Sequence, residues 1–290
     1  YKRQILHGGI NLMFSNANSF KAKIKNMAKD RGIPAQQLQQ NFLIEQVLKL
    51  IAKSSYKDSF IVKGGYLIGQ LIGLDKRTTM DLDVTLKGTA LSQENLITIF
   101  EEILSDSDDV FSFEVDKLEP IRQDDEYGGF SLKLNATFDT LREVVFIDIT
   151  TGDKITPREI TYSMPSLFAN EIIEVWTYNL ETVLAEKLET IISRGVASTR
   201  PRDRYDLFTL YHIRKDEIDF DVLRKALANT VEKRGSKEAI DIWASQLKNI
   251  ETDEYQKQLW TRYQRQFKYA QDISFEKSVQ IVRELMTTIM

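Results

Sequence analysis

The pattern of apolar and polar positions divides the chain into a mixed first part and a helical second part. Apolar residues at helical spacing predict helices over residues 17–29 and 35–53, and Pro34 suits the first turn of the second. Further along, the pattern predicts strands over 60–62, 81–86, 110–118, 130–138 and 143–150, with helices over 66–74 and 91–104. After Glu171 it predicts only helices, over 180–193, 202–213, 221–232, 237–247, 253–269 and 275–288. We therefore expect an α+β fold, with N-terminal helices and a mixed-sheet core in 1–170 and a helical domain in 171–290.

Two acids stand on one of the predicted strands. Asp81 and Asp83 are two residues apart, so their side chains leave the same face of the strand. Neighbouring carboxylates repel and stay ionised together most easily around a divalent cation. The chain has no cysteine and two histidines, so an oxygen-rich site favours Mg²⁺ or Mn²⁺ over zinc. An Asp-x-Asp alone is more often a solvated strand face.

A phosphate-binding turn is expected just upstream of the acids. The strand over 60–62 stops at Gly64-Gly65, where a helix follows. Backbone N–H groups at a helix N-terminus, without side chains in the way, can bind a phosphate. A Gly-Gly pair alone is usually a simple turn. Beside a metal-binding carboxylate pair, however, it indicates nucleotidyl transfer from a nucleoside triphosphate, with one ion orienting the triphosphate and another activating the attacking hydroxyl.

A third carboxylate interrupts an apolar strand pattern. Asp148 follows Val145-Phe146-Ile147, and a buried strand rarely carries an uncompensated acid. We expect Asp148 to complete the metal site with Asp81 and Asp83. The alternatives are an edge strand that exposes Asp148 to solvent, or a structural pair with Lys133 or Arg142.

Charge is uneven along the chain. Residues 1–33, 34–193 and 194–290 carry net charges of +6, −13 and +3. An acidic middle with basic flanks suits a metal–carboxylate site whose anionic partner is held by the flanks, although such asymmetry also arises from ordinary solvated surfaces. No apolar run approaches the roughly 20 residues of a membrane span, and no leader pattern opens the chain. A cytoplasmic protein without membrane contact is the simplest expectation.

Four segments together resemble a known family. They are Lys63-Gly64-Gly65 followed by Arg77-Thr78-Thr79, then Asp81-Leu82-Asp83, Leu184–Glu189 and Arg202–Leu207. In this order they are similar to the motifs of the AbiEii-type nucleotidyltransferase toxins and their MenT relatives, from abortive-infection and toxin–antitoxin systems of phage defence. Gly65 departs from the wider polymerase-β-like superfamily, which often has Ser there, but the backbone donors remain.

The resemblance implies a fold, a reaction and partners. It implies a polymerase-β-like nucleotidyltransferase core with a helical C-terminal domain, and a Mg²⁺- or Mn²⁺-dependent enzyme. Such an enzyme moves a nucleoside monophosphate from an NTP to an RNA acceptor, with the tRNA 3′ end the best-supported acceptor among relatives. It further implies a separately encoded antitoxin that need not contact the toxin directly.

The resemblance also implies roles for residues outside the acidic strands. Lys187 would hold donor phosphates, and Asp203, preferred over Asp206, would act in catalysis or position Lys187. Lys187 interrupts an apolar stripe, so it either extends to solvent from the edge or meets an anion. Asp203 lies in the first turn after Pro201, where an acid is favourable for dipole reasons alone.

Further cations are candidates for phosphate contacts. We expect Lys63, Arg77 and Thr79, with Gly64 and Gly65, to contact the nucleotide. A basic cluster is formed by Arg194, Arg200, Arg202 and Arg204. Arg200, Arg202 and Arg204 are its candidate RNA-binding residues, and solvated loop charge is the alternative for the cluster.

Two other functions remain open on the sequence. The same site could serve a small molecule or a protein hydroxyl as acceptor. The fold could also be a degenerate module that only binds NTP, but a dead site has no need to keep two repelling acids.

Overall fold

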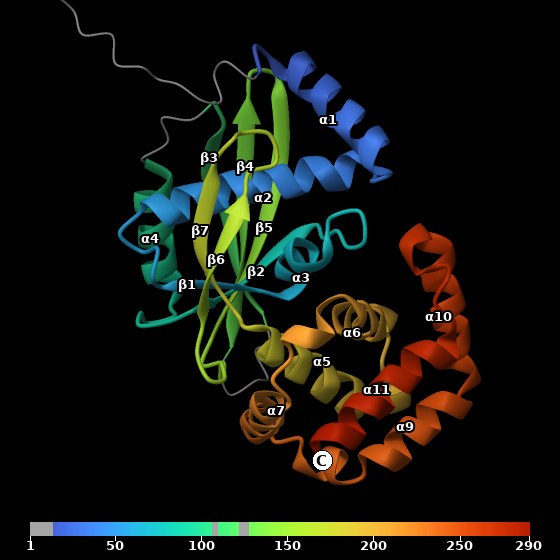
Figure 1. Ribbon diagram of the computed structural model, residues 1–290. Coiled ribbons are helices and arrows are strands. Elements are labelled where there is room, and N and C mark those ends of the chain that lie inside the picture. The colour runs from blue at the N-terminus through green and yellow to red at the C-terminus, as the bar shows by residue number, and fades with distance from the viewer. Residues whose placement is uncertain (1–13, 106–109, 122–127) are drawn as a thin grey trace, which may run out of the picture. The chain divides into compact units, whose positions relative to one another are not determined.

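The computed structural model describes residues 14–105, 110–121 and 128–290 (Figure 1). Residues 1–13, in the predicted basic N-terminal flank, lie outside this range. The chain forms two compact units. The sheet unit comprises residues 1–70, 78–152 and 161–177, and the helical unit comprises 71–77, 153–160 and 178–290. Both units are discontinuous in sequence, unlike the single boundary at residue 170 that the pattern predicted.

A seven-stranded mixed sheet forms the centre of the sheet unit, in the order β3-β4-β5-β2-β1-β7-β6. The strands are β1 Phe60–Lys63, β2 Asp81–Leu86, β3 Ser112–Ile121, β4 Gly129–Phe138, β5 Leu141–Thr151, β6 Ile160–Pro165 and β7 Ile172–Thr177. Strand β2 runs antiparallel to β1 and parallel to β5, and β4 is antiparallel to both β3 and β5. The α+β fold class expected from the sequence is confirmed.

The two faces of this sheet differ in chemistry. One face is apolar and fully buried, with residues such as Val84, Leu132 and Ile147. Helices α1 (Ala17–Arg31), α2 (Ala35–Lys53) and α4 (Gln93–Ser105) supply side chains to this core, and α2 runs across the strands in Figure 1. Phe20 of α1 packs edge-on against Phe138, at a ring-centroid distance of 6.4 Å. The alternating residues of the other face are mostly polar and half-buried, and the predicted acids lie there.

The helical unit is built from the C-terminal helices. They are α5 Leu180–Arg194, α6 Pro201–Arg214, α7 Phe220–Arg234, α8 Lys237–Asp241, α9 Trp243–Thr252, α10 Glu254–Gln266 and α11 Phe275–Ile289. Helix α5 packs against α6 and α7, and α6 packs against α11. Local signals set the helix starts that matter for function: the Asn179 side chain accepts a 2.8 Å hydrogen bond from the Thr182 N–H, and Pro201 begins α6.

The structure corrects three features of the predicted pattern. Strands β6 and β7 were not predicted. The residues directly after Glu171 form strand β7 and not a helix, and every second residue of β7 is buried, as in a strand with one face on the core. The helix predicted over 237–247 is two helices that meet at Ile242. Helix α3 (Gly64–Ile72) begins at Gly64 itself rather than at residue 66. No helix among the described residues is both long and apolar enough to cross a bilayer.

Candidate active site

Three acidic side chains share the polar face of the sheet. Asp83 and Asp148 are register partners on the parallel neighbours β2 and β5, and Asp81 precedes Asp83 by two residues. Asp148 accepts a 2.7 Å hydrogen bond from the Ser131 hydroxyl on β4. All three acids are partly accessible to solvent. The register thus places the three predicted acids on one surface of two adjacent strands.

The structural alternatives for Asp148 involve other partners. The Lys133 ammonium lies 2.7 Å from a carboxylate oxygen of Asp116. The Arg142 guanidinium donates to the backbone carbonyls of Asp139 and Leu141. Neither cation is therefore the counter-ion of Asp148 in the described part of the chain.

Gly64 is required by its backbone and by its neighbour. Its φ of +65° lies in the left-handed region that L side chains rarely adopt. A Cβ built on Gly64 would overlap the carboxylate of Asp83. The first residue of α3 therefore touches the acid that we expect to bind metal, and this brings a helix N-terminus to the edge of the acidic face.

Lys63 lies on the same face as the acids. It is the register partner of Asp83 on β1, and its side chain is buried. Its ammonium donates a 2.6 Å hydrogen bond to the hydroxyl of Thr150, two residues after Asp148. This buried cation offsets part of the negative charge that Asp83 and Asp148 place on the face.

The donor set on this face fits magnesium in one specific way. Within the described residues, no three Asp, Glu or His side chains lie close enough together to hold a single ion. Magnesium in nucleotide sites is usually held by one or two carboxylates, with phosphate oxygens and water as the other ligands. Asp83, with Asp81 or Asp148 beside it, offers such a partial set.

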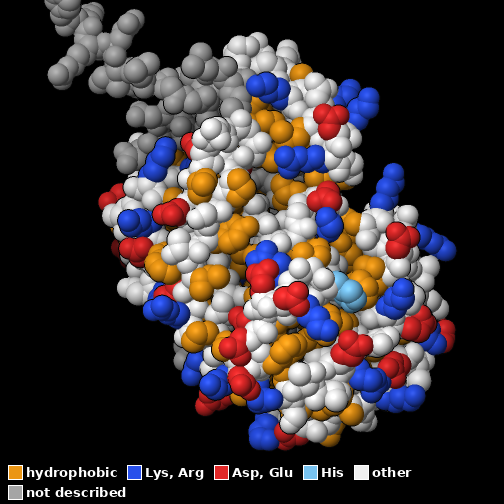
Figure 2. Space-filling view, viewed as in Figure 1, with side chains coloured by type: hydrophobic (Ala, Val, Ile, Leu, Met, Phe, Trp, Pro, Cys, Tyr) orange, Lys and Arg blue, Asp and Glu red, His pale blue; other side chains and the backbone are white. Residues whose placement is uncertain are grey.

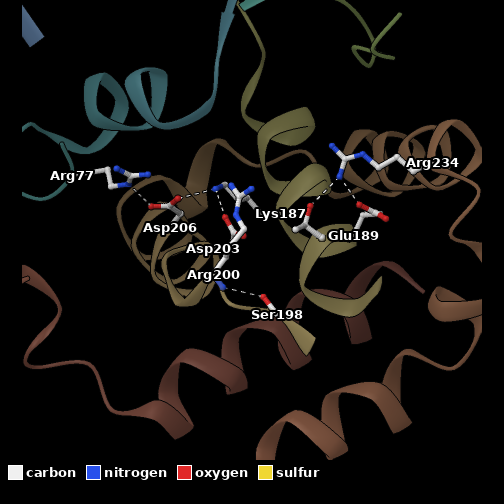
Figure 3. A network of polar contacts seen from close by, with 9 residues as sticks. Arg77, Lys187, Glu189, Ser198, Arg200, Asp203, Asp206 and Arg234 are labelled. Atoms are coloured by element: carbon white, nitrogen blue, oxygen red, sulfur yellow. Dashed lines mark hydrogen bonds and ion pairs between the residues drawn. The ribbon is translucent and has the colours of Figure 1, made fainter. Parts of the chain in front are cut away.

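A second polar cluster forms inside the helical unit (Figure 3). The Lys187 ammonium on α5 lies 2.6 Å from Asp203 and 2.9 Å from Asp206, both on α6. Asp206 uses its second oxygen to accept a 2.8 Å hydrogen bond from Nε of Arg77. The Arg200 side chain lies 3.1 Å from the free oxygen of Asp203. Lys187 thus meets anions, as one of its two sequence interpretations required, and these anions belong to the protein itself.

Mutual attraction keeps this cluster charged despite burial. Burial alone would lower the pKa of Lys187, but Asp203 and Asp206 outweigh it and raise the pKa above its usual value. Burial would likewise raise the pKa of Asp203, but Lys187 and Arg200 hold it below its usual value. The cluster combines three cations with two carboxylates, so it carries one net positive charge.

Arg204 does not fit the RNA-binding role predicted for it. Its side chain is 1% exposed, and its guanidinium donates a 3.0 Å hydrogen bond to Gln256. The guanidinium carbon also lies over the rings of Trp260 and Phe275, at 5.6 and 5.2 Å from their centroids. Burial lowers the pKa of Arg204 to about 10. Arg204 is therefore a core residue of the helical unit, and the prediction was wrong for this residue.

The other arginines of the predicted cluster remain accessible. Arg202 and Arg194 are exposed, and Arg200 is half-buried beside Asp203. On the face drawn in Figure 2, basic and acidic side chains are interspersed and do not gather into large areas of one sign. Any binding of a polyanion at this face would therefore depend on local contacts.

Two nucleotide-binding candidates from one sequence segment fall in different units. Arg77 belongs to the helical unit, where it donates a hydrogen bond to Asp206. Thr79 belongs to the sheet unit, where its carbonyl accepts a 3.3 Å hydrogen bond from the Asn41 side chain. The sequence allowed Asp206 to pack against an arginine, but it did not identify Arg77 as that residue. The three-residue spacing of Asp203 and Asp206 puts both acids on one side of α6. This spacing is consistent with their shared contact to Lys187, but it gives no indication of Arg77.

Comparison with known proteins identifies the family. A sequence model of the family described as "Nucleotidyl transferase AbiEii toxin, Type IV TA system" matches residues 46–281, most of the chain. The chain belongs to the AbiEii nucleotidyltransferase toxin family. Membership in the AbiEii family implies a nucleotide substrate and an antitoxin partner, and it confirms the resemblance seen in the four sequence segments. No curated protein sequence matches the chain.

Solved structures that are similar to this chain include three nucleotidyltransferase-like or related proteins. A protein described as a nucleotidyltransferase from H. pylori is similar with a TM-score of 0.50 and 14% identity, over 89% of this chain and 97% of that one. JHP933 from Helicobacter pylori has a TM-score of 0.48 and 15% identity, over 88% and 93%. An antigenic nucleotidyltransferase-like protein from Paracoccidioides brasiliensis has a TM-score of 0.38 and 17% identity, over 68% and 91%. The first of these similarities shows a nucleotidyltransferase fold.

Proposed function

We propose that this AbiEii-family chain transfers a nucleoside monophosphate from an NTP to the 3′ hydroxyl of a tRNA in the cytoplasm, with release of pyrophosphate. The observation that carries the proposal is the polar sheet face, where Asp83 and Asp148 are register partners and Gly64 starts a helix against Asp83. Carboxylates beside a helix N-terminus provide metal ligands next to phosphate-binding N–H groups, as nucleotidyl transfer requires.

Each element of the face has a distinct task in this proposal. The backbone of Gly64 and Gly65 at the start of α3 would bind the donor phosphates. Asp83, with Asp81 or Asp148 beside it, would hold Mg²⁺, which when bound neutralises phosphate charge and favours ionisation of the attacking hydroxyl. The hydrogen bond from the Ser131 hydroxyl would hold the Asp148 carboxylate in place. Lys63 and Thr79 would add contacts to the nucleotide.

The cluster of the helical unit is, taken by itself, a candidate for binding a phosphate. An ammonium has three N–H donors, and two of those on Lys187 are directed to Asp203 and Asp206. A phosphate oxygen can take the third, and the net positive charge of the cluster favours an anion there. Asp203 and Asp206 would then position Lys187, and Arg77 would stabilise Asp206.

Incubation with labelled NTPs tests the reaction directly. We expect the protein to label RNA when it is mixed with total cellular RNA, Mg²⁺ and at least one of the four NTPs. A chelator should abolish labelling, because the acidic face and the triphosphate are both negatively charged and repel each other unless a metal ion lies between them. Label that survives the chelator would remove the metal from the mechanism. Label that appears only on protein or on a small molecule would favour the other acceptor classes.

The salt dependence of RNA binding tests the role of the exposed arginines. Each phosphate that a cation neutralises on a single strand lowers log affinity by roughly 0.7 per log unit of salt. In the double variant Arg194→Gln/Arg202→Gln we expect a slope that is shallower by about 1.4. Lys237→Gln is the matched control, because Lys237 is an exposed cation on α8 that pairs with Asp241. An unchanged slope in the double variant would move the RNA surface elsewhere.

A further inference from the structure

One aromatic side chain breaks the polar character of the acidic face. Phe146 lies on β5 two residues before Asp148, so both side chains leave the same face of the strand. Phe146 is the register partner of Asp81 on β2 and of Lys133 on β4. Its side chain is 41% exposed, whereas its neighbours Val145 and Ile147, on the apolar face, are fully buried. An exposed phenyl ring therefore lies beside the predicted metal ligands.

The strand order places this ring on one side of the acids. Across the sheet, β1 with Lys63 is followed by β2 with Asp81 and Asp83, and then by β5 with Phe146. Neighbouring strands are about 4.8 Å apart, so β5 lies about 10 Å from β1, at whose end the donor phosphates are proposed to bind. Phe146 is thus separated from the donor side by the strand that carries the acid pair. The space over β5 and β4 remains for the molecule that accepts the nucleotide.

The surroundings of Phe146 also suit a nucleic-acid strand. Lys133 and its register partner Lys117 on β3 continue the same face away from the acids. Both are accessible, and they pair with the exposed acids Asp116 and Glu119 at 2.7 and 2.6 Å. Exposed ion pairs of this kind are weak, so a phosphate can replace the carboxylate partner. An aromatic ring followed by accessible cations is the arrangement by which proteins bind single strands.

We propose that Phe146 is a stacking platform for the 3′-terminal base of the acceptor RNA. Stacking on the ring would hold the last nucleotide beside Asp81 and Asp148, with its 3′ hydroxyl directed to the acids. The base is recognised through its flat face, so the platform itself selects a single-stranded end and not a sequence. This inference rests on the proposed RNA acceptor and adds the surface that receives it.

Substitutions at Phe146 test the platform. With Phe146→Ala we expect KM for the acceptor RNA to rise about 5- to 150-fold while KM for the NTP stays unchanged. Phe146→Trp keeps a stacking ring and should restore KM to near the wild-type value. Ile172→Ala is the matched control, since Ile172 is an exposed apolar residue of the same sheet, on β7, and its truncation should change neither KM.

An acceptor that lacks only its terminal base separates stacking from a general loss of structure. We expect wild-type protein to bind a 5′-fluorescent RNA about 5- to 150-fold more weakly when the 3′-terminal nucleotide of that RNA is abasic. This is the same factor by which Phe146→Ala should raise KM for the intact RNA. For Phe146→Ala, binding of the intact and abasic RNAs should be equal. A higher KM for NTP alone would assign Phe146 to the donor base and overturn the inference. Unchanged RNA affinity in Phe146→Ala, while the wild type still labels RNA, would overturn it without touching the proposed function. Failure of the wild type to label RNA would overturn both.

Discussion

Replacing Asp83 with alanine is expected to abolish nucleotidyl transfer and the growth arrest that it causes, while the protein stays folded. Loss of one preorganised charged group in an active site costs about 10²–10³-fold in rate, and a metal ligand costs at least that. Stability should change by less than about 1 kcal/mol. Removal of the acid relieves repulsion from Asp148 but also loses a favourable charge at the start of α3.

The measurement pairs a transfer assay with thermal unfolding of the same preparation. Glu114→Ala is the matched control, because Glu114 is an exposed acid on β3, at the far edge of the same sheet. It should leave both the rate and the melting temperature at wild-type values. An active Asp83→Ala protein, or one that cripples growth on expression, would show that the acidic face is not the catalytic site.

Replacing Asp206 with alanine is expected to destabilise the helical unit strongly. Asp206 has no exposed side-chain surface, and its two oxygens bind two cations, Arg77 and Lys187. Removal of one partner from a buried ion pair costs about 3–5 kcal/mol, because the remaining charge stays desolvated. Asp203→Ala should cost less, since one of the two cations it contacts, Arg200, is 36% exposed and can turn to water.

Denaturant unfolding of the two variants checks this ranking. Asp241→Ala serves as the reference for a surface pair, because Asp241 binds Lys237 on an exposed helix face and should change stability by at most about 0.5 kcal/mol. Equal, small losses for all three variants would mean that the buried cluster adds nothing to stability.

The cluster also changes the expectation for Lys187→Met, which would leave two buried carboxylates behind. Activity loss in that variant must therefore be compared with its stability.

The shared face of the three acids could be predicted because its signals are local. The two-residue period of a strand is enough to put Asp81 and Asp83 on one face, and the acid in an apolar strand marked Asp148 as unusual. The Gly-Gly pair predicted a helix N-terminus whose backbone N–H groups can bind a phosphate. The structure shows in addition that Gly64 contacts Asp83. The pairing of β2 with β5, which joins these signals, is a property of the whole sheet.

The features that the sequence did not reveal depend on distant partners. Arg77 and Asp206 are 129 residues apart, and no local pattern connects them. Arg204 looked like one of several loop cations, but Gln256, Trp260 and Phe275 enclose it from later helices. Phe146 was hidden in the opposite way: an apolar run conceals which of its members faces solvent, and the burial along β5 shows that Phe146 does.

The discontinuous helical unit has a consequence for the order of events during synthesis. Arg77 leaves the ribosome 129 residues before Asp206, which at 5–20 residues per second is roughly 6 to 26 s. During that interval the segment 71–77 has no helical unit to join, because α5 and α6 do not yet exist. The lysine–carboxylate cluster can therefore form only after Asp206 on α6 has been made. A nascent chain therefore carries all three acids of the sheet face well before the cluster can form.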